Sequence, residues 1–125
     1  MSRSVRLAMA ALLALGAVVG GTSAATAGDD PESITVEFDP AEARTGTAQS
    51  QDLRLFCRYT YTPARDAVVS ANCYHTGVVH GLYMLTAMCG DGSWVVGQPS
   101  VYGSSASLNC PGSFGVRLVR MVPMR

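Results

Sequence analysis

The chain has 125 residues and contains no lysine, and its nine arginines balance nine acidic residues to a formal net charge of zero. This length suits one small domain, and the charge balance excludes the strongly basic surface on which nucleic-acid binding depends. We therefore predict no nucleic-acid partner.

Residues 1–27 have the pattern of a secretory signal peptide. Arg3 and Arg6 give a positive start, and Leu7–Val19 is an apolar run too short for a permanent membrane-spanning helix. The segment Ala25–Ala27 fits the small-residue cleavage rule, so we expect a mature chain that begins at Gly28 with a net charge of −2. We expect a secreted, extracellular protein without membrane attachment after cleavage; a leader retained as an anchor is the alternative.

Residues 28–52 are predicted to form an acidic, flexible N-terminal arm. They contain seven acidic residues against one base, Arg44. Pro40–Gln51 consists mostly of small and polar residues and shows no helical or strand periodicity, which is typical of a linker. Only Ile34–Phe38 alternates between apolar and polar residues well enough to predict a strand. An arm that folds over the cationic remainder of the chain is the alternative interpretation.

Residues 53–125 are predicted to form a β domain, which starts with a hairpin. Leu53–Tyr61 alternates between apolar and polar positions, which is typical of a half-buried strand. Thr62–Asp66 supplies proline and aspartate for a turn, and Ala67–Tyr74 returns as the second strand.

The rest of the domain continues as short strands. Val78–Met88 is apolar on both faces, which favours a central strand, although a buried helix also fits. Asp91 and Gly92 form a hairpin signal before Trp94–Val96, and the last strands are Ala106–Cys110 and Phe114–Val122. This spacing predicts an all-β fold, a six-stranded sandwich or small barrel.

Four cysteines, all downstream of the leader, predict two disulfides in an oxidising compartment: Cys57, Cys73, Cys89 and Cys110. Four cysteines allow three connectivities. A short internal echo, Ser70–Cys73 against Ser107–Cys110, favours pairing within each repeat, Cys57 to Cys73 and Cys89 to Cys110. A chance match between the two segments would leave all three connectivities open.

Fifteen residues separate Cys57 from Cys73, and a wider second pair follows in a β-rich secreted chain. This frame resembles the small proteinaceous α-amylase inhibitors of the tendamistat type. The resemblance implies sequential disulfides, a six-stranded sandwich and inhibition of a hydrolase. The family's Trp-Arg-Tyr triplet is absent between the first two cysteines, where the nearest fragment is Arg58-Tyr59. The segment around Cys110-Pro111-Gly112 also looks like short secreted actinobacterial proteins of unassigned function.

Residues suited to catalysis or metal binding are sparse. His75 and His80, five apart, would point to opposite faces of a strand, so they make a poor metal pair. No nucleophile-elbow motif is present, and disulfide-bonded cysteines cannot act as nucleophiles. We therefore expect no enzymatic activity, no cofactor and no metal.

These patterns favour a small non-catalytic secreted binding protein, for example an inhibitor of an extracellular hydrolase, whose partner is a protein or a polysaccharide. A structural or cell-surface protein is the alternative, and a small secreted enzyme or antibacterial toxin ranks last. The first candidate contact is Arg65 at the tip of the first hairpin, although an ordinary turn with a solvated arginine is the preferred interpretation of this segment. Trp94, beside the Asp91-Gly92 turn, is the second candidate.

Overall fold

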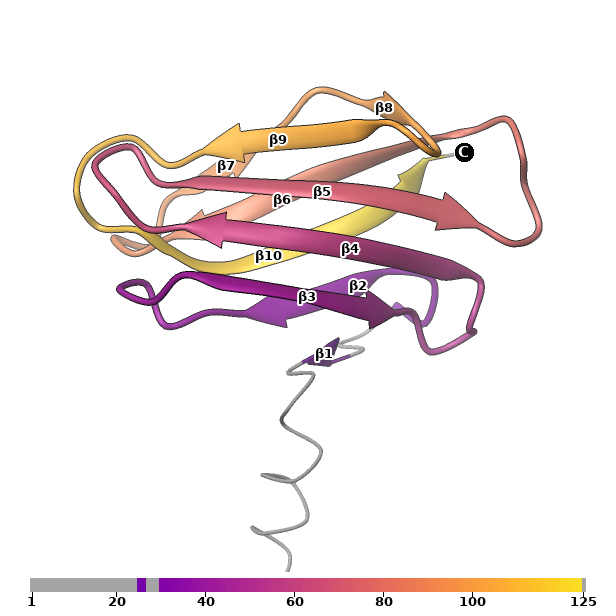
Figure 1. The fold of residues 1–125 in the computed structure, drawn as a ribbon, viewed down its shortest axis with the longest axis horizontal. Helices are drawn as coiled ribbons and strands as arrows, with labels where there is room; N and C mark the ends of the chain where they lie inside the picture. The colour runs from indigo at the N-terminus through magenta and orange to yellow at the C-terminus, as the bar shows by residue number, and fades with distance from the viewer. Residues whose placement is uncertain (1–24, 27–29, 125) are drawn as a thin grey trace, which may run out of the picture.

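The computed structural model describes residues 25–26 and 30–124, which form two packed antiparallel sheets with no helix among them (Figure 1). The expected all-β sandwich is confirmed. The strands are β1 (Ala25–Thr26), β2 (Ile34–Glu37), β3 (Arg44–Gln49), β4 (Leu55–Thr62), β5 (Val68–His75), β6 (Leu82–Cys89), β7 (Trp94–Val96), β8 (Ser100–Val101), β9 (Ser105–Asn109) and β10 (Val116–Met124).

The two sheets form the front and back layers in Figure 1. The front sheet has four strands in the order β3-β4-β5-β9. The back sheet has six strands in the order β1-β2-β10-β6-β7, and the short β8 pairs with β6 beyond β7. Hairpin turns and crossing loops gather at the two ends of the sandwich, where the turns from β4 to β5 and from β6 to β7 lie at the same end.

The core forms because alternate residues of each strand point between the sheets. On β4 every second residue is buried, as the alternation in the sequence predicts. The buried residues are Leu55, Cys57, Tyr59 and Tyr61. They pack in one cluster with apolar side chains of β6 and β10, among them Leu85, Val119 and Met121.

Burial raises the pKa of the Tyr83 hydroxyl, which lies against the carbonyl oxygens of Ala71 and Ser104.

The two disulfides have the connectivity that the internal echo favours. Cys57 and Cys73 stand directly opposite each other on β4 and β5, with Cα atoms 4.1 Å apart. Cys89, at the end of β6, joins Cys110, which follows β9, so this bond connects the two sheets. The predicted pairing is confirmed, and no cysteine is left as a thiol.

The N-terminal segment departs from the prediction of a flexible arm over residues 28–52. Within the described part, 30–52, β2 pairs with β10 and buries Ile34 and Val36, while β3 pairs with β4 along its whole length. β3 is an edge strand whose one fully buried side chain is Ala48, so its sequence carries no apolar alternation. Its pairing with β4, rather than local pattern, makes it a strand.

Smaller departures concern where strands begin and how many there are. Leu53 belongs to a turn, with φ 62°, and its amide donates to the Ser50 carbonyl. The strand expected over Val78–Met88 starts only at Leu82, and its helical alternative is wrong. The sandwich exceeds six strands because β1, β2 and β3 join it and β8 pairs briefly with β6.

Most of the predicted leader, residues 1–24 and Ala27, lies outside the described residues, so the signal peptide stays a prediction. Ala25 and Thr26 are described as β1, which pairs with Val36 and Thr35 of β2. Within the described part, no helix is long and apolar enough to cross a membrane.

We expect N-terminal sequencing of the exported protein to begin at Gly28, because Ala25 and Ala27 occupy the two small-residue positions that cleavage requires. Cleavage there would remove β1 and leave β2 at the edge of its sheet. A mature form that still carries Arg3 and Arg6 would contradict the prediction.

Candidate functional site

The first candidate, Arg65, lies exposed in the turn between β4 and β5. Two hydrogen bonds tie this turn to the loop before β10: the Asp66 amide donates to the Gly112 carbonyl, and the Gly112 amide donates to Asp66 Oδ1, each at 2.8 Å. Arg65 borders a hollow of about 490 Å³ whose other lining residues are prolines, glycines, alanines and Ser113. The hollow therefore has a fixed shape and few groups that could recognise a ligand.

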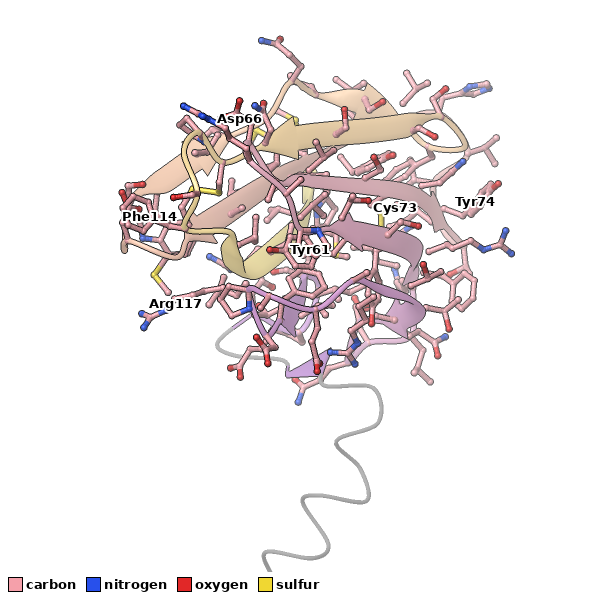
Figure 2. The ribbon with its side chains drawn as sticks, turned by 60° about the vertical axis from the view of Figure 1, so that its left-hand side comes forward. Tyr61, Asp66, Cys73, Tyr74, Phe114 and Arg117 are labelled. Carbon is pink, nitrogen blue, oxygen red and sulfur yellow. A yellow bond between two sulfur atoms is a disulfide. The ribbon has the colours of Figure 1, made fainter. Side chains whose placement is uncertain are left out.

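Tyr61 fixes the same end of the sandwich from inside. Its hydroxyl donates to the Pro40 carbonyl at 2.6 Å and accepts from the Val116 amide at 3.0 Å. Its ring stacks on Phe38 with centroids 4.7 Å apart. Figure 2 shows Tyr61 beneath the loops that carry Asp66 and Phe114. The loops at this end are thus connected to one another rather than independent.

The second candidate, Trp94, opens β7 and is 54% exposed. It stands opposite Met88 of β6, and in an antiparallel pair directly opposed side chains share one face of the sheet. By the same register Val96 stands opposite Thr86, and Val101 of β8 opposite Leu82. Val95, which lies between Trp94 and Val96 on β7, points inward and packs against the core.

β10 extends this surface on the other side of β6. Leu118 stands opposite Met88, Val122 opposite Met84, and Met124 opposite Leu82. The outer side of the six-stranded sheet therefore presents a set of contiguous apolar side chains, all at least partly exposed, which we call the apolar face: Leu82, Met84, Met88, Trp94, Val96, Val101, Leu118, Val122 and Met124.

Arg120 lies at the border of the apolar face toward β2. It stands between Thr35 and Thr86 in the ladder and is only partly exposed. In the part of the chain that the structure describes, its guanidinium makes no ion pair. The nearest acidic position on this face is Glu37, one row away and opposite Leu118 at the β2 edge. Arg120 therefore has threonines as its cross-strand neighbours, and the apolar Leu118 and Val122 flank it along β10.

The titratable groups elsewhere stabilise turns. Hydrogen bonds from the Ser50 and Ser93 hydroxyls lower the pKa of Asp52 and of Asp91 respectively. The His75 imidazole accepts a hydrogen bond from the Gly77 amide, 3.0 Å from Nδ1. Among residues 25–26 and 30–124, no three His, Cys, Asp or Glu side chains are grouped to hold a metal ion.

Arg58 and Tyr59, the fragment nearest to the α-amylase-inhibitor triplet, point to opposite sides of β4. Arg58 is exposed on the outer side of its sheet, whereas Tyr59 is buried between the sheets. They cannot contact a partner together.

Comparison with known proteins finds no protein family, no curated protein and no solved structure that matches the chain. The candidate site therefore rests on the geometry of this chain alone.

Sequence reasoning found Trp94 but not the surface around it. The available signal was the apolar character of both faces of the segment Val78–Met88, which predicts a central strand. Whether the second face of such a strand is covered depends on a further layer, and here none of the described residues covers it.

Proposed function

We propose that the protein is a non-catalytic extracellular binding protein that engages another protein through the apolar face. The observation that carries this proposal is the continuity of apolar side chains across β7, β6 and β10, on the side of the sheet away from the core. Contiguous apolar surface of this kind is characteristic of interaction sites, whereas scattered single residues are not.

The composition of the face supports a protein as the partner. Trp94 offers a large rigid anchor of the kind found at binding hot spots. Met84 and Met88 are flexible thioethers that adapt to an apposed apolar surface. Arg120, on β10 at the border of the face toward β2, favours a partner that brings an acidic group to that border.

An extracellular hydrolase is the partner class that we place first. The cysteine spacing that resembles α-amylase inhibitors supports it, and so does the fixed architecture, since a pre-organised surface loses little entropy on binding. The hairpin tip at Arg65 is the competing contact surface.

The test is to incubate the mature protein with a panel of purified secreted proteases and glycosidases and to measure hydrolysis rates. We expect inhibition of at least one enzyme, and we expect Trp94→Ala to weaken it by more than tenfold, about 1.4 kcal/mol. The melting temperature should stay nearly unchanged, because the indole is largely exposed. Arg65→Ala is the matched control, with an expected change below about twofold.

Three results would contradict parts of this proposal. A loss confined to Arg65→Ala would move the contact to the hairpin tip. A panel without any inhibited or bound enzyme would exclude the hydrolase target. A homodimer in light scattering that Trp94→Ala dissociates would make the apolar face a contact between two copies.

A further inference from the structure

The outer side of the four-stranded sheet, the layer nearest the viewer in Figure 1, carries a hollow that the proposed function does not use. Its volume is about 300 Å³, and its main side chains come from β4, β5 and β9: Phe56, Arg58, Thr60, Asn72, Tyr74 and Ser105. It lies on the opposite side of the sandwich from the apolar face.

Two aromatic rings stand side by side at one end of this hollow. Phe56 and Tyr74 are directly opposite each other in the β4–β5 ladder, so both point outward. Phe56 is 41% exposed and Tyr74 54%, and Figure 2 shows Tyr74 projecting away from its strand. Exposed rings on neighbouring strands offer apolar surface whose π faces attract the C–H side of a sugar ring.

Polar groups follow in the next two rows of the ladder. Arg58 stands opposite Asn72, and Asn72 in turn stands opposite Ser105. The row beyond is formed by hydroxyl side chains alone, with Thr60 opposite Ser70. Donors and acceptors for a ligand rich in hydroxyl groups therefore begin one row from the aromatic pair.

The Asn72 side chain is held in place by a hydrogen bond from its amide nitrogen, but its amide oxygen lacks a partner within the described part of the chain. Its Nδ2 donates to the Gly103 carbonyl at 3.3 Å, and the Gly103 amide donates to the Cys73 carbonyl at 2.8 Å. Its Oδ1 is buried and has no hydrogen-bond partner among residues 25–26 and 30–124. A buried acceptor without a donor is costly, so a ligand hydroxyl that reached it, with a small shift of the exposed side chains beside it, would gain a strong partner.

The charge of the hollow selects among such ligands. Arg58 is exposed, and among the described residues of strands β3, β4, β5 and β9 it is the one charged side chain at an outward position. None of the described residues that line the hollow is acidic. A guanidinium binds a carboxylate through two parallel hydrogen bonds, so the site is complementary to an anionic group carried by a flat hydroxylated ring.

We propose that this hollow binds an acidic oligosaccharide, a chain that contains uronic-acid residues. The sugar ring stacks on Phe56 and Tyr74, the carboxylate pairs with Arg58, and ring hydroxyls bond to Asn72 and the serine and threonine rows. A single cation on a mature chain with an expected net charge of −2 makes a nucleic acid the poorer match.

The test is calorimetric titration of the mature protein with an oligogalacturonate of defined length, with its methyl ester and with a neutral glucan of equal length as matched ligands. We expect saturable binding of the oligogalacturonate that weakens as salt increases. Arg58→Gln and Tyr74→Ala should each weaken it at least tenfold, and Phe56→Ala provides a second aromatic variant. Trp94→Ala, an exposed aromatic on the other sheet, should change the affinity by less than twofold.

Equal affinity for the methyl ester would overturn the acidic assignment. No heat change at millimolar oligogalacturonate would overturn the site itself, provided that the melting curve shows a folded protein. An equal loss in Trp94→Ala would overturn the location. Trp94 belongs to the apolar face and Arg58 does not. The titration can therefore fail while the hydrolase panel succeeds, or the reverse, and the two proposals are tested separately.

Discussion

Replacing Cys89 and Cys110 together by serine is expected to destabilise the mature domain by about 2–5 kcal/mol, the usual cost of a native disulfide in a small secreted domain. The bond closes a loop with a sequence separation of 21 and connects the two sheets. Without it the unfolded chain gains conformational freedom, and two buried positions receive hydroxyl groups that need partners. For a domain of this size, at about 4–8 °C per kcal/mol, the melting temperature should fall by at least about 8 °C and by up to about 40 °C.

The matched variant replaces Cys57 and Cys73, whose sequence separation is 16. Because the entropy of loop closure depends weakly on length, this pair should cost a similar amount. Non-reducing peptide mapping of the unmutated protein checks the connectivity first. Melting by circular dichroism then measures both variants, and an unchanged melting temperature in either would contradict the structural role of that bond.

Gly90→Ala is the single substitution with the largest expected effect. A Cβ at Gly90 would lie 2.0 Å from the carbonyl oxygen of Phe114, and that oxygen belongs to backbone that cannot rotate away. The Gly90 amide also donates to the Gly115 carbonyl at 2.8 Å, so relief of the clash would break this hydrogen bond. Overpacking together with a lost buried hydrogen bond should cost about 2–4 kcal/mol.

Gly77→Ala is the control for this substitution. Its Cβ would meet only side-chain atoms, the nearest 3.5 Å away on His75, and its φ lies outside the left-handed region. The expected change is within about 0.5 kcal/mol. Urea denaturation with a common slope measures both variants. Equal stability of the two alanine variants would show that the loop before β10 is not fixed against the end of β6.

Several features of the fold could be predicted from local pattern because the physics behind them is local. The alternation of Leu55, Cys57, Tyr59 and Tyr61 determines which side of β4 is buried. The Asp91-Gly92 pair marks the hairpin between β6 and β7, and the Ser93 amide indeed donates to Asp91 Oδ1 at 3.0 Å. The echo around Cys73 and Cys110 favoured the disulfide connectivity that the structure has.

The strand expected over Ile34–Phe38 is present as β2, whereas β3 could not be predicted in this way. β3 reads Arg-Thr-Gly-Thr-Ala-Gln and buries one alanine, so apart from the β-branched threonines it lacks the apolar alternation that predicts a strand. Its strand character comes from hydrogen bonds to β4, with Gly46 opposite Tyr59. A Cβ at Gly46 would lie 2.6 Å from the Tyr59 hydroxyl, so glycine there makes room for the buried ring. Both facts depend on pairing with the next strand, β4, and not on the residues of β3 alone.

The sequence by itself determined that this is a disulfide-bonded all-β protein, because residue alternation, turn chemistry and cysteine content are properties of short segments. Only the tertiary structure decided which surfaces exist. Trp94 becomes part of an apolar face because β7 and β10 flank β6, and Phe56 meets Tyr74 because β4 pairs with β5 in one register. A shift of one residue would turn each of these side chains to the opposite side, so both candidate sites depend on strand register, which long-range pairing sets.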